Sequence, residues 1–182
     1  APDQSRIYFI STREGPNSDG ELIEENFDIW YSDWDPEMEE WLPAKNLESV
    51  NTSGIEASPF IAADNQTLFF ASNGWEPNYG DLDFYVCRYD YGNDTWSKPE
   101  NLGRPLNTEL REQFITLPAS GDIIYFSSTR EDLSGYQGSL DIFMAFVPTF
   151  FKTVIVKVLL LTNAQVKTYR LLFRLKIRLP AG

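Results

Sequence analysis

The chain has 182 residues and a formal net charge of −12, because 27 Asp and Glu side chains outnumber 15 Lys and Arg side chains. It contains no histidine, which excludes Ser-His-Asp and Cys-His catalysis and His-ligated zinc. The acidity argues against a nucleic-acid partner, since phosphate binding depends on basic side chains. The single cysteine, Cys87, cannot form an intramolecular disulfide.

The charge is unevenly distributed along the chain. Residues 1–141 contain all 27 acidic side chains and 8 basic ones, whereas residues 142–182 contain 7 basic side chains and no acidic one. Such a break in composition usually marks a domain boundary. We therefore predict two parts, residues 1–147 and a basic tail of residues 148–182.

In chain order, an apolar run that ends in a polar turn occurs three times, at residues 7–13, 68–74 and 124–130. A second motif follows each run, at residues 27–31, 82–86 and 140–144, and a third motif occurs twice, at 41–47 and 96–102. The repeated positions are Asp28, Asp83, Asp141, Trp41, Trp96, Asn46 and Asn101. The near-constant spacing between these positions predicts an internal repeat of about 55 residues, which is typical of modular β-folds.

Each repeat carries only β-strand signals, because short aromatic and β-branched runs alternate with Gly, Asn, Asp, Pro and Ser. In the middle repeat we expect strands at about residues 58–63, 67–72, 83–89 and 95–99. Four strands per repeat predict the blade of a β-propeller. The fold class is therefore expected to be all-β, a partial propeller of about two and a half four-stranded antiparallel blades, with Tyr8, Phe70 and Phe126 on interior strands.

The combined motifs resemble the TolB-like, WD40-like β-propeller repeat over about residues 5–146. They comprise the I-Y-F-S-S-x-R run, the D-I-Y/F strand, and W-x-x-P-x-N-L-G followed by N-T-x-x-x-E. The family is common in the bacterial cell envelope, especially in OmpA-family lipoproteins that join a propeller to a peptidoglycan-binding domain. The resemblance implies a periplasmic or outer-membrane protein that contacts a protein or a cell-wall glycan. Gly74 departs from the motif at the position where the other repeats have Arg13 and Arg130.

Two and a half blades leave open edges, so we expect either a piece of a larger propeller or association through those edges. In the tail, strand-like runs at residues 153–161 and 168–177 flank a polar turn, and no apolar run approaches the length of a transmembrane span. A basic helix on a membrane surface, the start of a small β-sandwich and unrelated sequence remain alternatives for the tail. We predict that residues 153–161 pair with the edge after Phe146, with Lys152, Lys157 and Lys167 facing the acidic blades.

The repeated aspartates are interpreted as structural, because an active site is normally built once and not once per repeat. We expect Asp28, Asp83 and Asp141 to cap turns, and Trp41 and Trp96 to pack between blades. Arg13 and Arg130, at strand ends, are candidate contacts for a carboxylate ligand. The preferred interpretation is that they pair with acidic side chains in the neighbouring loop.

The function predicted is a non-catalytic binding or scaffold module, with no catalytic residue, cofactor or metal. The acid cluster at residues 33–40 lacks the order of a calcium loop, and residues 90–96 only approach the Asp-box of sialidases, so both are interpreted as turns. The alternative function is a piece of a carboxylate-dependent propeller glycosidase or lyase. That chemistry needs two carboxylates roughly 5–10 Å apart in one pocket.

Overall fold

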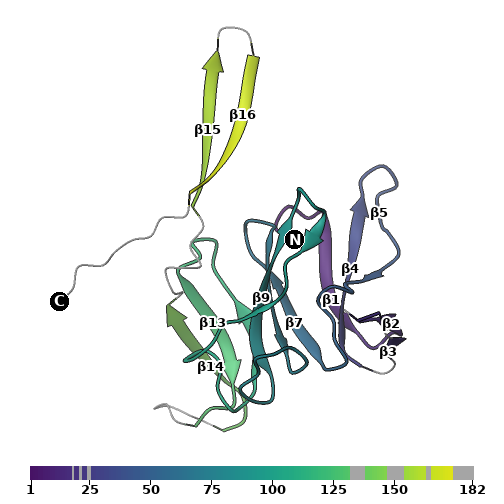
Figure 1. The fold of residues 1–182 in the computed structure, drawn as a ribbon, viewed down its shortest axis with the longest axis vertical. Helices are drawn as coiled ribbons and strands as arrows, with labels where there is room; N and C mark the ends of the chain where they lie inside the picture. Colours follow the sequence, from purple (N-terminus) through teal and green to yellow (C-terminus); the bar gives the residue numbers. More distant parts are fainter. Residues whose placement is uncertain are drawn as a thin grey trace, which may run out of the picture. The chain divides into compact units, whose positions relative to one another are not determined.

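The computed structural model describes residues 1–17, 19–20, 26–131 and 138–146, together with the backbone of residues 22–23, 154–162 and 165–173. The chain divides into two units, Ala1–Ala145 and Phe146–Gly182. Every regular element among the described residues is a β-strand, and nearly all strand pairing is antiparallel (Figure 1). The predicted all-β class is therefore confirmed.

The first sheet is built on the long strand β4 (Asp28–Asp35), which pairs with β1 (Arg6–Ser11) and places Tyr8 opposite Tyr31. Two short strands, β5 (Glu40–Trp41) and β6 (Lys45–Asn46), also pair with β4. In the segment of chain that connects β1 to β4, β2 (Gly15–Pro16) pairs with β3 (Leu22–Ile23) in a separate two-stranded sheet.

The second sheet corresponds to the middle repeat and is the most completely buried. Its strands are β7 (Glu56–Ile61), β8 (Thr67–Ser72), β9 (Asp83–Asp90), β10 (Thr95–Trp96) and β11 (Glu100–Asn101). Their order is β10-β9-β8-β7, with β11 also paired to β9. Every residue of β8 is buried, as expected for a strand with neighbours on both sides and side chains packed on both faces.

The third sheet has the order β12-β13-β14, from β12 (Glu112–Thr116), β13 (Ile123–Ser128) and β14 (Asp141–Phe146). A bulge interrupts the β12–β13 ladder between Gln113 and Thr116, and Phe114 within it has a φ of 58°. β7 has the matching bulge between Ala57 and Phe60. The two sheets therefore share their irregularities as well as their strand order.

The predicted strands of the middle repeat are close to those observed, although the fourth is only two residues long and β11 was not expected. Phe70 and Phe126 lie on the interior strands β8 and β13, as predicted. The prediction for Tyr8 is wrong, because β1 ends its sheet. The residues before β1 form turns and bends, and none of them pairs with its outer side as β7 does with β8.

The main core lies between the first and second sheets. It comprises Ile29, Leu47, Val50, Leu68, Phe70, Tyr85, Cys87 and Trp96. Phe70 and Tyr85 stack with ring centroids 5.9 Å apart. Phe84, on the opposite face of the second sheet, meets Phe126 of the third sheet edge-to-face at 5.7 Å. Burying each such side chain contributes about 1.5–3 kcal/mol, so these contacts join consecutive sheets into one unit.

The tail forms a hairpin in which β15 (Val154–Thr162) pairs with β16 (Gln165–Phe173). The further pairing of residues 153–161 with the edge at β14 concerns a contact between the two units and stays a prediction. A local hairpin closes a much shorter loop, which costs less chain entropy. The side chains of Lys152, Lys157 and Lys167 lie outside the described residues. No described helix has the length and apolarity to cross a membrane.

Candidate functional site

Two buried asparagines, Asn51 and Asn107, each form hydrogen bonds to the backbone of an earlier strand of the same repeat, β4 or β9. We call each of these contacts an asparagine clamp. The side-chain amide of Asn107 accepts a hydrogen bond from the backbone N–H of Phe84 at 2.8 Å and donates one to its carbonyl at 2.9 Å. Asn51 makes the same pair of bonds with Ile29, at 2.8 and 2.9 Å. Both asparagines are fully buried, so each replaces a strand partner for one residue of β4 or β9.

The repeated aspartates lie beside these clamps. Asp83 accepts hydrogen bonds from the backbone N–H of Tyr79 at 2.7 Å and from Asn101 at 2.8 Å, whereas Asp28 accepts one from Asn46 at 3.1 Å. Within the described part of the chain, Oδ1 of each aspartate is buried without a hydrogen-bond partner. Burial raises the pKa of both carboxyl groups above the usual value for Asp. Asp141 is half-buried at the start of β14.

A buried glutamate follows each clamp. Glu56 accepts hydrogen bonds from the backbone and hydroxyl of Thr52 at 2.8 and 2.7 Å, and from Ser72 at 2.7 Å. Glu112 has the equivalent bonds from Thr108 and Ser128. Burial, which outweighs these bonds, raises the pKa of Glu56 to about 7. These residues come from the end of one repeat and the start of the next, so the network fixes how the two sheets are joined.

Arg130 adds a cation to the second of these networks. Its guanidinium donates to Glu112 at 3.3 Å and to the backbone carbonyls of Pro105 and Leu106 at 3.2 and 2.6 Å, and the residue is 6% exposed. All of these partners are internal. Arg13, the other candidate ligand contact, is exposed, and its guanidinium lies 5.7 Å from the ring centroids of Phe9 and Trp30.

The two repeated tryptophans have different surroundings. Trp96 is 8% exposed and contacts the rings of Tyr8 and Tyr89, so it packs between the first two sheets. Trp41 is 42% exposed and contacts Trp34 of its own sheet edge-to-face at 5.3 Å. Equal sequence positions therefore yield one core side chain and one surface side chain.

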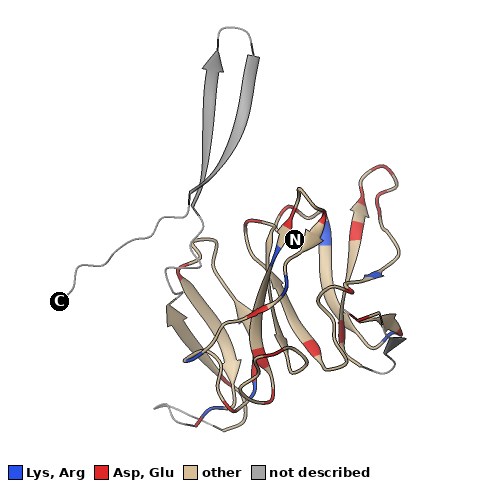
Figure 2. Ribbon diagram, in the orientation of Figure 1, with Lys and Arg blue, Asp and Glu red and all other residues tan. Residues whose placement is uncertain are grey.

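The acid cluster at residues 33–40 and the Asp-box-like segment at residues 90–96 both contain turns. Acidic side chains gather at strand ends and turns of the first unit, including the turn between β4 and β5 (Figure 2). There Asp35 accepts bonds from the backbone N–H groups of Glu37 and Met38, and Asp90 accepts one from Gly92 in the β9–β10 turn. Among the residues that the structure describes, no three His, Cys, Asp or Glu side chains are grouped to hold a metal ion.

A groove opens between the first and second sheets, with polar residues of β1, β4 and β6 along one wall. Two hollows of about 830 and 230 Å³ share Arg6, Asp33, Tyr89 and Trp96 in their walls. Arg6 Nε lies 2.5 Å and Lys45 Nζ 3.8 Å from the carboxylate of Asp33. Burial alone would lower the pKa of Arg6, but its bond to Asp33 raises it above the usual value, so the guanidinium stays charged.

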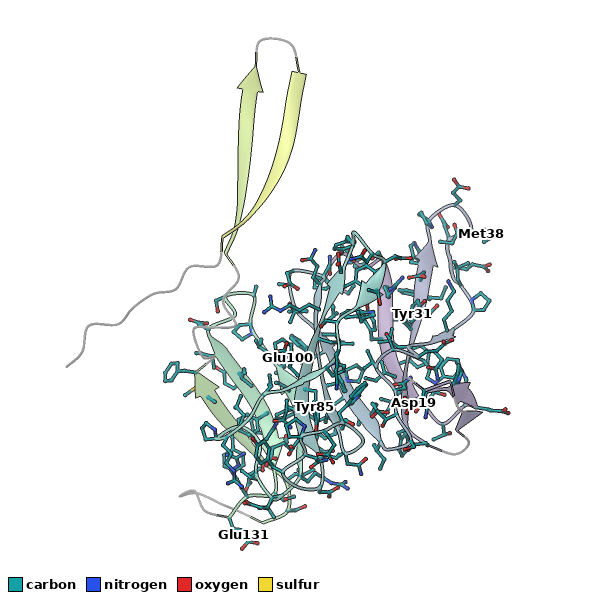
Figure 3. The ribbon with its side chains drawn as sticks, in the orientation of Figure 1. Asp19, Tyr31, Met38, Tyr85, Glu100 and Glu131 are labelled. Atoms are coloured by element: carbon teal, nitrogen blue, oxygen red, sulfur yellow. The ribbon has the colours of Figure 1, made fainter. Side chains whose placement is uncertain are left out.

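Aromatic side chains also line this groove between the first and second sheets, which we name the aromatic groove. The Arg6 guanidinium lies 4.2 Å from the ring centroid of Tyr31, which is among the wall residues labelled in Figure 3. Across the groove, Tyr89 meets Tyr91 edge-to-face at 5.0 Å, and Tyr91 is 58% exposed. Accessible rings beside fixed charges provide both flat apolar contacts and directed hydrogen bonds.

Sequence reasoning identified neither the groove nor the roles of Asn51 and Asn107. The signal for the polar network was visible, because N-T-x-x-x-E occurs at residues 51–56 and again at 107–112. The groove had no such signal, since its walls come from residues 6, 31, 33, 45 and 89–96, which no single motif contains.

Comparison with known proteins adds no family assignment: no protein-family model matches the sequence, and no curated protein matches it.

Proposed function

We propose that the chain is a non-catalytic binding module of the TolB-like β-propeller type, placed in the bacterial cell envelope, that binds a glycan in the aromatic groove. The propeller and envelope assignments are supported by the in-phase sequence repeat and its family resemblance. The observation that carries the ligand assignment is the wall of tyrosines beside the Arg6–Asp33–Lys45 group.

Sugar rings present an apolar C–H face and a rim of hydroxyl groups. Exposed tyrosine faces such as that of Tyr91 suit the first, and fixed donors and acceptors such as Arg6 and Asp33 suit the second. The charges in the groove are of both signs, with Asp19, Glu48 and Asp94 beside the two cations. A neutral, hydroxyl-rich ligand fits such a surface better than a strongly charged one does.

A glycosidase or lyase would need one groove carboxyl group that holds a proton beside a second that is ionised. Asp33 is engaged by two cations, Arg6 and Lys45, an arrangement that suits a fixed ligand contact. The carboxyl groups with raised pKa, Glu56, Asp28 and Asp83, line neither hollow of the groove. This division supports binding over hydrolysis.

The test is isothermal titration of the full chain with soluble glycan strands prepared from bacterial cell wall. We expect saturable binding that Tyr91→Ala weakens about tenfold, since one aromatic contact contributes about 1 kcal/mol or more. The matched control is Tyr79→Ala, another exposed tyrosine, which lies outside the groove and should leave binding unchanged.

Two results would overturn this assignment. Cleavage of the glycan strands by the purified chain would favour the enzyme alternative. Absence of glycan binding, together with saturable Tyr91-dependent binding of a purified envelope protein, would favour a protein partner.

A further inference from the structure

The outer face of the third sheet is apolar and exposed. Ile142 is 81%, Met144 55% and Tyr125 40% exposed. They share one face, because Phe126 and Phe143, their neighbours along β13 and β14, stack with each other at 5.8 Å and side chains alternate along a strand. We name Tyr125, Ile142 and Met144 the trailing face.

The second sheet shows what normally lies on such a face. The repeat aligns Tyr125, Ile142 and Met144 with Phe69, Phe84 and Val86, which are 3%, 0% and 4% exposed. Phe84 is covered by Phe126 of the following sheet. The position that is buried by a successor sheet in the second repeat is thus uncovered in the third.

The first sheet has the complementary surface. Ile7 and Phe9 align with Leu68 and Phe70 of the second sheet, which are fully buried in the core shared with Ile29 of the first sheet. Ile7 itself is 40% exposed and Phe9 is half-buried. We name Ile7 and Phe9 the leading face, the side that in the second and third sheets receives the preceding sheet.

We propose that the trailing face of one copy of this chain packs on the leading face of a second copy, continuing the sheet-on-sheet contact already made twice within each copy. A head-to-tail contact of this kind closes when two copies bury both pairs of faces. Three sheets from each copy would then make a ring of six, within the range of four to eight known for propellers. The proposal is independent of the ligand in the aromatic groove.

The experiment is sedimentation equilibrium of the full chain, compared with two variants. We expect a discrete dimer, whose dissociation constant rises about 100-fold or more in Ile142→Asp/Met144→Asp and likewise in Ile7→Glu. The matched controls are Met38→Asp, where Met38 is 58% exposed in the β4–β5 turn, and Ile10→Glu, where Ile10 is 42% exposed on the opposite face of β1. Both controls should remain dimeric.

Mixing the two variants gives the sharpest outcome. The trailing-face variant retains an intact leading face and the Ile7→Glu variant an intact trailing face, so an equimolar mixture should recover one contact and form a heterodimer. A symmetric contact between like faces would give no such recovery. The proposal would be overturned by a wild-type chain that is monomeric at a protein concentration 100-fold above the one used in the glycan titration. A dimer that both variants leave intact would also overturn it. Either result would do so even if glycan binding persists.

Discussion

Nη2 of Arg130 lies 3.3 Å from Oε1 of Glu112, and both side chains are almost fully buried. Among the described residues, no cation forms a salt bridge with the equivalent glutamate, Glu56, and position 74, which aligns with Arg130, is glycine. A Cβ at Gly74 would lie 1.7 Å from the hydroxyl oxygen of Thr52, so no side chain fits there without a shift. The replacement of arginine by glycine at this repeat position therefore distinguishes two otherwise equivalent carboxyl groups. Glu112 has an ion pair in addition to its hydrogen bonds, whereas Glu56 has only its hydrogen bonds to other described residues.

The first prediction concerns pH. The pKa of Glu56 is about 7 in the folded chain against 4.5 unfolded, so the folded state holds the proton more tightly. The free energy of unfolding should be highest below about pH 4.5 and should fall by roughly 3 kcal/mol at most as pH rises to about 7. The raised pKa values of Asp28 and Asp83 act in the same direction. Urea unfolding at pH 5 and 7.5 measures the difference.

The control for this prediction separates Glu56 from the other acidic groups. Glu56→Gln should reduce the pH dependence, whereas Glu48→Gln, at an exposed position, should leave it as in wild type. Equal pH dependence in wild type and Glu56→Gln would contradict the assignment.

The second prediction concerns the buried ion pair. Arg130→Met should lower the free energy of unfolding by about 3–5 kcal/mol, because Glu112 is left buried without its cation. Arg130→Met/Glu112→Gln should regain part of that loss, since no uncompensated charge remains. A double variant no more stable than Arg130→Met, measured by urea unfolding, would argue that the bonds to Pro105 and Leu106 dominate.

A third prediction separates stability from binding at the repeated aspartates. Asp83→Ala should cost about 1–2 kcal/mol, because it removes bonds to Tyr79 and Asn101, and Asp28→Ala should cost less, since one bond is lost. Thermal unfolding gives the order. Glycan titration should be unchanged in Asp83→Ala; loss of binding at unchanged stability would reverse the structural interpretation.

The fourth prediction uses the unequal tryptophans. Trp96→Ala should destabilise the chain by about 3–5 kcal/mol, since it opens a cavity between Tyr8 and Tyr89. Trp41→Ala should cost about 1 kcal/mol, because its ring is 42% exposed and contacts mainly Trp34. Similar losses in chemical denaturation would mean that the two positions are energetically equivalent after all.

Strand identity was predictable where the local pattern decides it. The apolar run of β8 and its flanking turn residues fixed its ends at Thr67 and Ser72, as observed. The environment of Trp41 was not predictable, because it depends on which sheet lies beside the first one and not on the motif around it. The pairing of β15 with β16 was not predicted for a related reason: strand-forming sequence alone does not identify a partner, whereas the short loop between the two strands favours a local hairpin.

The candidate site shows the same division. Asp83 and Asn101 could be singled out because the repeat displays the aspartate three times and the asparagine twice. The aromatic groove arises where two repeats meet, and Arg6 and Tyr89 have no shared motif to reveal that they line one hollow. Sites made between repeats depend on packing, which a single sequence does not display.

The asparagine clamps have a consequence for how the repeat can be rebuilt. Asn51 and Asn107 bind the backbone of Ile29 and Phe84, so the clamp is indifferent to the side chain that it holds. The chain already carries an aliphatic residue at one of these positions and an aromatic residue at the other. A designer who exchanges a 55-residue module could therefore change the residue that the clamp holds and keep the clamp, because its partners are peptide groups that every non-proline residue supplies. The ring contacts between sheets, such as Phe84 on Phe126, would still have to be matched.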